Sequence, residues 1–372
     1  MFPRQSGYGR PRVKREHQPL RRADGTIQIG GDIYGIASAI DDPDGSLWRI
    51  LRLVDGTRTV GEIGADSGQP GQAVAALLEV LQEGGFLEDA DAQDSTVLSP
   101  EEQQRYSRPQ AFYRWIDLSP RPSAWTVQER IKDSSVVVVG LGGGGSSAAL
   151  ALAASGVGQL HLVDHDVVEL SNLTRQFLYT EADLGRPKTE AAVERLRAAN
   201  STISVTSEEA EVDSVDALRR LVKGCDVLAM CADQPRDIRH WAEIACREAG
   251  VPWVTGGYIG PRVVAQTFGR GEEACFECLH LRSGDEGRDA PSVVSEPDDP
   301  PLLENDEIAA SNAISAGLSG LMIAHAVLAH ITGAPNWGDG GFQFGLNLAA
   351  PEQQLYLTGD RYPGCPLCSG RG

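Results

Sequence analysis

A strand, a glycine-rich turn and a helix follow one another directly in this sequence, and that succession limits the folds open to the chain. The apolar run Val136–Val139 predicts a buried strand, and the next residues read GLGGGG. An alanine-rich segment then predicts a helix, and Gln159–Val163 predicts a second strand that ends at Asp164. This is the pattern of a βαβ nucleotide site, with an acid placed to bind ribose hydroxyls. The residues expected to cradle phosphates are Gly140, Gly142, Gly143 and Gly145.

The residues after Asp164 point to a triphosphate rather than to a nicotinamide cofactor. The motif SNLTRQ spans Ser171–Gln176, and GRPK ends at Lys188. Pro187 suits the first position of a helix and would present Lys188 in its first turn, although an ordinary helix-start cation has the same appearance. Hydride transfer gives no reason for two cations and an amide here. An NAD-dependent oxidoreductase is therefore supported by the glycine turn alone.

From Ser134 onward, strand and helix patterns alternate, which predicts an α/β fold with a Rossmann-like, mostly parallel sheet over residues 96–372. Residues 283–308 are acidic and proline-rich, which indicates a mobile loop before a helix of small residues at 309–332. The further strands expected are Ser204–Ser207, Val227–Met230 and Trp253–Gly256.

The first 95 residues predict a flexible segment, 1–24, and a small separate domain, 25–95. A hairpin of Thr26–Ile29 with Ile33–Ile36, three helices and a wing starting at Phe86 would make a winged-helix-like α+β domain. The third helix, Gln72–Glu83, has no Lys or Arg to contact phosphate, so DNA binding is disfavoured. Its predicted apolar face consists of Val74, Leu77, Leu78, Val80 and Leu81.

Charge and hydropathy exclude other classes of function. A net charge of -19 argues against a general nucleic-acid partner, which would need a basic surface. No apolar run approaches the roughly 20 residues of a membrane span. The basic N-terminus lacks the apolar region of a secretion signal. We therefore expect a cytoplasmic protein with no membrane partner.

Four of the seven cysteines form two C-x-x-C pairs, which suit a closed tetrahedral zinc site. A disulfide pair is the alternative, which a cytoplasmic location disfavours. Cys225, Cys231 and Cys246 stand singly within predicted strands or helices and are expected to be buried structural thiols. The expected zinc ligands are Cys275, Cys278, Cys365 and Cys368.

A series of motifs from Arg105 to Cys368 resembles the adenylating domain of the ubiquitin-activating-enzyme-like superfamily, the ThiF/MoeB/HesA group. In order they are RYSRPQ, GLGGGG, VDHD, SNLTRQ, GRPK, CADQ and the paired C-x-x-C motifs. The resemblance implies that a carboxylate attacks the α-phosphate of ATP and expels pyrophosphate, with Mg²⁺ present. The small domain resembles the PqqD-like peptide-recognition domain. The combination resembles microcin C and pantocin maturation enzymes, whose substrates are genetically encoded peptides.

The resemblance also implies roles for single residues. Asn172 and Arg175 would contact the β- and γ-phosphates, and Lys188 the α/β region. Asp166 would be a supporting acid or a turn residue at the nucleotide site. Asp233 would hold Mg²⁺, a role suited to a carboxylate near phosphates, although a helix N-cap is the alternative.

Arg108 would reach ATP in the partner subunit, which implies a homodimer. The sequence has Pro109 before Gln110, a one-residue departure from the family spacing that puts Gln110 in doubt more than Arg108.

The segment before the small-residue helix, Glu304–Gly317, contains no cysteine, so an enzyme thioester there is disfavoured. We therefore expect adenylation of a carboxylate on a ribosomally made precursor peptide, without a thioester. One alternative is a sulfur-carrier adenylyltransferase acting on a protein that ends in Gly-Gly. Another is a non-catalytic partner that presents peptide to a cyclising enzyme. The intact nucleotide residues disfavour the non-catalytic role.

Overall fold

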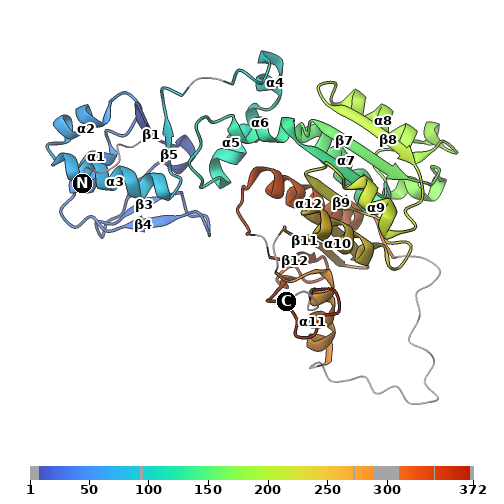
Figure 1. Cartoon of the computed structure of the whole chain (residues 1–372). Helices are drawn as coiled ribbons and strands as arrows, with labels where there is room; N and C mark the ends of the chain where they lie inside the picture. Colours follow the sequence, from blue (N-terminus) through green and yellow to red (C-terminus); the bar gives the residue numbers. More distant parts are fainter. Residues whose placement is uncertain (1–7, 93–94, 271–272, 289–309, 339, 369–372) are drawn as a thin grey trace. The chain divides into compact units, whose positions relative to one another are not determined.

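The computed structural model describes residues 8–92, 95–270, 273–288, 310–338 and 340–368 (Figure 1). The chain divides into two compact units. The N-terminal unit is Met1–Arg130 with Thr332–Asn336, and the C-terminal unit is Ile131–Ile331 with Trp337–Gly372. The sequence had predicted a boundary between residues 95 and 96. The structure instead groups residues 96–130 with the N-terminal unit.

The N-terminal unit combines two small antiparallel sheets with helices. One sheet has the order β2 (Leu20–Arg21), β3 (Ile27–Ile29), β4 (Ser38–Ile40), and the other pairs β1 (Pro11–Val13) with β5 (Leu87–Asp89). Buried residues such as Ile29, Ile50 and Leu78 form one core. The helices are α1 (Ser46–Leu51), α2 (Val60–Ser67), α3 (Gly71–Glu83), α4 (Pro100–Arg105) and α5 (Ser107–Ile116), with the 3₁₀ turn η1 (Arg15–His17). Helix α6 (Thr126–Asp133) contains the boundary between the two units.

Three predictions for the N-terminal unit are wrong in part. Residues 8–24, expected to be flexible, contain β1, η1 and β2, because β1 pairs with the wing strand β5. The hairpin partner of β3 is β4 rather than residues 33–36, since Gly30, Gly31 and Gly35 adopt positive φ and extend the turn. Val80 is 56% exposed and is not part of the apolar face of α3.

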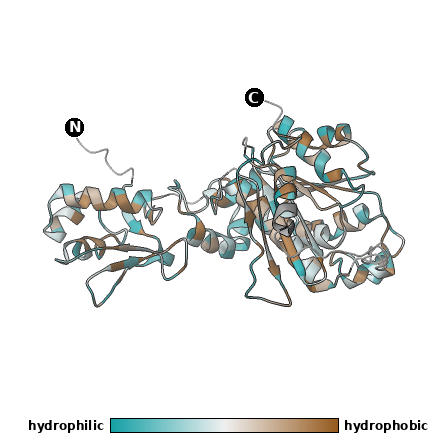
Figure 2. Ribbon diagram, turned by 90° about the horizontal axis from the view of Figure 1, so that it is seen from below, coloured by the Kyte–Doolittle hydropathy of each residue, from teal (hydrophilic) through white to brown (hydrophobic). Residues whose placement is uncertain are grey.

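The C-terminal unit is built on one eight-stranded sheet, which confirms the α/β fold. Its order is β13-β12-β11-β10-β9-β6-β7-β8, and the five strands from β10 to β8 are parallel. In Figure 2 the hydrophobic colour follows strands of this sheet, in agreement with the full burial of Val136 and Val138. The strands are β6 (Ser135–Val139), β7 (Gln159–Asp164), β8 (Ser204–Glu209), β9 (Val227–Met230), β10 (Trp253–Ile259), β11 (Arg262–Phe268), β12 (Phe342–Asn347) and β13 (Leu357–Thr358).

The strand order has a switch point between β6 and β9. The chain leaves β6 toward β7 on one side and later returns to β9 on the other. In open α/β sheets, ligands bind at the carboxyl ends of the strands at such a point. The helices are α7 (Gly143–Ser155), α8 (Lys188–Ala199), α9 (Val215–Leu221), α10 (Ile238–Ala249), α11 (Phe276–Arg288) and α12 (Ala313–Thr332), with 3₁₀ turns η2 (Leu170–Thr174) and η3 (Glu181–Asp183).

Two further expectations need correction. Helix α11 continues to Arg288, so the start of the predicted loop 283–308 is helical, and its remainder lies outside the described residues. No membrane-length apolar run was expected, yet α12 is long and apolar enough to cross a membrane. Its most apolar stretch is 61% buried inside the protein, and a core helix meets the same criteria.

Candidate active site

A cavity of about 740 Å³ opens in the C-terminal unit where β6, β7 and β9 end. Its volume lies within the usual range for small-molecule sites. The loops after these strands and the strands β10, β11 and β12 supply its walls. The structure thus brings together residues that are 67 positions apart in sequence, from Asp166 to Asp233. The charged and amide residues predicted for the nucleotide that line the cavity are Asp166, Asn172, Arg175, Lys188 and Asp233.

The predicted glycines divide into two groups. Gly142 and Gly143 line the cavity, as does Gly144, which is not one of the four glycines predicted from the sequence. Gly140 and Gly145 are not among the lining residues. Gly140 has φ +87°, and a Cβ at Gly145 would lie 1.8 Å from the Gly140 carbonyl oxygen. These two glycines therefore shape the turn and let α7 pack closely on it, while the others face the cavity.

Asp164 stabilises the glycine turn through hydrogen bonds to backbone N–H groups and does not face the cavity. It is 8% exposed and is not a lining residue. Its carboxylate accepts hydrogen bonds from the Leu141 N–H at 2.6 Å and from the Asp166 N–H at 2.8 Å. The observed contacts are thus structural, and the ribose-binding role of Asp164 stays a prediction.

Lys188 is a buried cation in the cavity wall. It is 5% exposed, and its ammonium group lies 2.7 Å from the Asp166 carboxylate. It is the first residue of α8, and Pro187 occupies the N-cap position rather than the first helical position that the sequence suggested. Because one exposed carboxylate is the ion-pair partner of this buried ammonium in the structure, an anionic ligand in the cavity would stabilise Lys188 further.

The first four residues of the SNLTRQ motif lie in the 3₁₀ turn η2, and Arg175 is the C-cap of this turn. The Asn172 Oδ1 accepts from the Glu169 N–H at 3.1 Å, and the Arg175 guanidinium donates to the Ser171 carbonyl at 3.1 Å. Asn172 is buried, whereas Arg175 is partly exposed to the cavity. The local backbone therefore orients both side chains before any ligand binds.

Asp233 lies three residues beyond the end of β9, and its side chain is exposed at the cavity. The N-cap of α10 is Asp237, so the N-cap alternative for Asp233 is wrong. Arg239 of α10 faces the same region and donates to the Gly256 carbonyl at 3.1 Å. Burial lowers the pKa of Arg239 while Asp233 raises it. An exposed carboxylate in a cavity rich in cations suits a metal held together with phosphates.

Several cavity residues were not predicted from the sequence. Gln176 is 3% exposed, and its buried Oε1 has no hydrogen-bond partner among the described residues. The Gln266 amide donates to the Gln343 carbonyl oxygen at 3.1 Å across β11 and β12. Gln176 is the last residue of the SNLTRQ motif, so the sequence offered a reason to consider it. The neighbours of Gln266 and Gln343 in sequence give no such indication, because only the pairing of strands in the sheet brings these residues to the cavity. Tyr258 of β10 is a further member of this group.

Cys231 also lines the cavity, although it was expected to be a structural thiol like Cys225 and Cys246, which are buried. Burial raises the pKa of the Cys231 thiol to about 12. The thiol is therefore protonated at neutral pH and is a poor nucleophile.

Arg108 is not part of this cavity. It lies exposed on α5 in the N-terminal unit. Its predicted role belongs to a second subunit, so the assignment stays a prediction.

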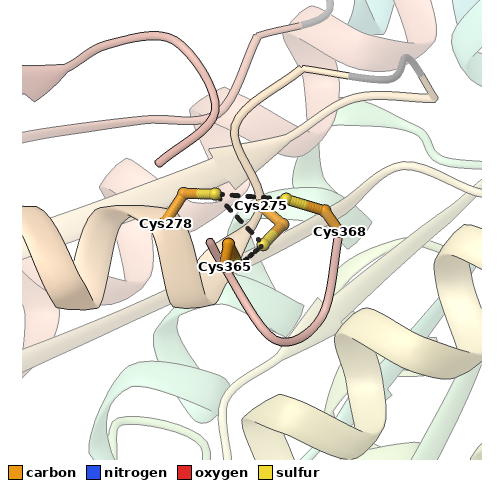
Figure 3. A group of neighbouring side chains, drawn as sticks. All are labelled: Cys275, Cys278, Cys365 and Cys368. Atoms are coloured by element: carbon orange, nitrogen blue, oxygen red, sulfur yellow. Dashed lines mark hydrogen bonds between the residues drawn. The ribbon is translucent and has the colours of Figure 1, made fainter. Parts of the chain in front are cut away.

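The four cysteines of the C-x-x-C pairs converge into one buried cluster (Figure 3). The Cys275 sulfur lies 3.5 Å from that of Cys278 and 3.6 Å from that of Cys365, and Cys278 lies 3.3 Å from Cys368. Four thiolates around one zinc ion lie roughly 3.8 Å apart, whereas a disulfide bond is about 2.05 Å. All four thiols are free, and the cluster could hold a metal ion.

Comparisons with known proteins show what this chain is similar to. The model of the ThiF family matches residues 113–354. Molybdopterin-synthase adenylyltransferase of Salmonella typhimurium is 36% identical over 50% of this chain and 72% of its own length. The sulfur carrier protein ThiS adenylyltransferase of Escherichia coli is 33% identical over 41% of this chain and 60% of its own. The crystal structure of E. coli MccB with AMPCPP and MccA superposes with a TM-score of 0.73, covering 96% of this chain and 99% of MccB at 22% identity.

Proposed function

We propose that this chain, which belongs to the ThiF family of ATP-dependent adenylating enzymes, activates a carboxylate of a ribosomally made peptide. The observation that carries the proposal is the convergence of Arg175, Lys188 and Asp233 with the glycine turn around one cavity. Two cations, an exposed carboxylate and a helix N-terminus meet the needs of a triphosphate and its metal ion.

In the proposed reaction, an oxygen of the peptide carboxylate bonds to the α-phosphorus of ATP. The bond from that phosphorus to the bridging oxygen breaks, and pyrophosphate leaves with the electron pair. No proton is transferred in this step. Arg175 and Lys188 would offset the charge of the phosphates, and Gly142–Gly144 would let the backbone approach them. Asp233 fits as the ligand of Mg²⁺, which would neutralise further phosphate charge.

A peptide substrate is supported by the N-terminal unit. Its three-stranded antiparallel sheet ends in β4, whose outer edge could pair with an added peptide strand. The fold match to MccB, crystallised with MccA, extends over 96% of the chain and so includes this unit. We therefore assign the N-terminal unit to peptide recognition of the PqqD-like kind.

The cysteines support the proposal that no enzyme thioester forms. Residues 279–364 of the sequence contain none, and the cavity thiol Cys231 has a raised pKa. The acyl-adenylate would then react with a nitrogen or oxygen nucleophile, including one in the peptide itself.

A sulfur-carrier protein is the alternative substrate, because curated relatives of 33–36% identity are named for molybdopterin synthase and ThiS. A non-catalytic presenting role is less well supported, since the nucleotide residues are present and line one cavity. The cysteine cluster fits a structural Zn²⁺ that ties α11 to the C-terminal segment. A homodimer would bring Arg108 of one subunit to the ATP of the other.

The test is ATP–pyrophosphate exchange with synthetic peptides encoded by the short reading frames nearest the gene. A small carrier protein ending in Gly-Gly serves as the competing substrate, and Arg175→Ala as the inactive control. Peptide-dependent exchange identifies the substrate. Exchange with the carrier alone favours the alternative, and peptide binding without exchange favours the presenting role.

A further inference from the structure

Tyr258 places a hydroxyl group among the anion-binding elements of the cavity. It is the penultimate residue of β10 and lines the cavity. A Cβ at Gly143, the first residue of α7, would clash with the Tyr258 hydroxyl. Burial raises the pKa of Tyr258, and the Arg175 guanidinium, which lines the same cavity, lies near enough to oppose that shift. The phenol therefore lies against the N-terminus of α7 and shares the cavity with Arg175, a predicted phosphate ligand.

The hydrogen-bonding capacity of these groups indicates which kind of ligand atom they would bind. A guanidinium only donates, so Arg175 cannot accept the phenolic proton of Tyr258. The phenolic proton is then available for an oxygen acceptor. Burial is the main cause that raises the pKa of Tyr258, and the hydroxyl keeps this proton at neutral pH. Backbone N–H groups at a helix N-terminus are also donors. Three kinds of donor thus line the same cavity.

We propose that Tyr258 binds ATP by donating a hydrogen bond to an oxygen of its triphosphate, together with Arg175 and the N-terminus of α7. The inference rests on the proposed function only in that ATP is the nucleotide. It adds a neutral donor to the cationic residues that the family motifs supply. Such a donor strengthens as charge develops on the phosphate oxygens, and it costs no added repulsion between neighbouring cations.

The experiment measures the affinity of the full chain for MgATP and for adenosine by calorimetry. Tyr258→Phe keeps the ring and removes only the hydroxyl. A lost hydrogen bond to a charged group should weaken MgATP binding about tenfold or more. Adenosine has no phosphate, so its affinity should not change. Tyr356→Phe, at an exposed tyrosine outside the cavity, is the matched control and should bind both ligands as the wild type does.

The outcomes separate this inference from the proposed function. Unchanged MgATP affinity in Tyr258→Phe overturns the proposed role of Tyr258. An equal loss of affinity for adenosine also overturns it, because that result would indicate a purely structural role. A wild-type chain that does not bind MgATP overturns both proposals. Selective loss of MgATP affinity supports the role of Tyr258 even where no peptide gives pyrophosphate exchange. An effect of Tyr258→Phe that shrinks in an Arg175→Ala background supports action on the same phosphate.

Discussion

Replacing Gly145 by alanine should destabilise the C-terminal unit, whereas the same change at the adjacent Gly144 should not. Both residues lie in the first turn of α7. A methyl group at Gly145 would lie 1.8 Å from the Gly140 carbonyl oxygen, whereas one at Gly144 would meet nothing closer than 3.9 Å. The two substitutions are chemically identical and differ only in the space available to the added carbon.

The magnitude follows from these distances. To bring the Gly145 contact to an ordinary 3.4 Å, α7 and the turn must separate by roughly 1.6 Å. Overpacking against backbone of this kind costs about 2–4 kcal/mol of unfolding free energy. Alanine at Gly144 should instead stabilise the helix by about 0.5–1 kcal/mol, since glycine is a poor helix former.

Differential scanning calorimetry of the full chain measures both effects on the transition of the C-terminal unit. At about 2–4 °C per kcal/mol, Gly145→Ala should lower Tm by at least about 4 °C and Gly144→Ala should raise it slightly. MgATP affinity should fall in Gly145→Ala, because the turn that carries Gly142 moves. Equal shifts in the two variants, or an unchanged Tm for Gly145→Ala, would refute the assignment of Gly145 to close packing.

Three further predictions concern the proposed magnesium ligand Asp233, the cysteine cluster and the N-terminal unit. Asp233→Ala should reduce pyrophosphate exchange by at least about a hundredfold while Tm stays constant, because the side chain is exposed; undiminished exchange contradicts its role as metal ligand. Cys365→Ser should abolish the binding of zinc, measured by mass spectrometry of the purified chain, whereas Cys225→Ala should retain it; one zinc ion per chain in Cys365→Ser would rule out the four-cysteine site. Deleting residues 1–95 should weaken peptide binding and leave MgATP affinity unchanged, and an unaltered peptide affinity would remove the recognition role from this segment.

The sequence was most informative where contacts are local. The valine run of β6, the glycine turn and the acid at the end of β7 are contiguous, so their pattern predicts both the elements and their connection. The strands β6 to β10 all lie at or within three residues of their predicted bounds. The spacing of each C-x-x-C pair likewise indicates ligands for one metal ion before any fold is known.

In the N-terminal unit the sequence was a weaker guide because its strands are short and pair over long distances. The strand β1 is stabilised by β5, which follows it by more than 70 residues, so nothing within residues 8–24 indicates that this segment is ordered. The partner of β3 is likewise decided by a run of glycines whose turn length cannot be predicted from composition.

By itself, the sequence determined the class of fold, the nucleotide motifs and the two cysteine pairs, because each depends on residues that are neighbours along the chain. Only the tertiary structure decided which glycines face the cavity, which acid binds backbone instead of facing the cavity, and that Tyr258, Gln266 and Gln343 belong to the site. The physical reason is that the sheet sets these positions. A side chain on β10, β11 or β12 reaches the switch point because strands that are distant in sequence pair with one another. The residues next to it in sequence do not predict that pairing.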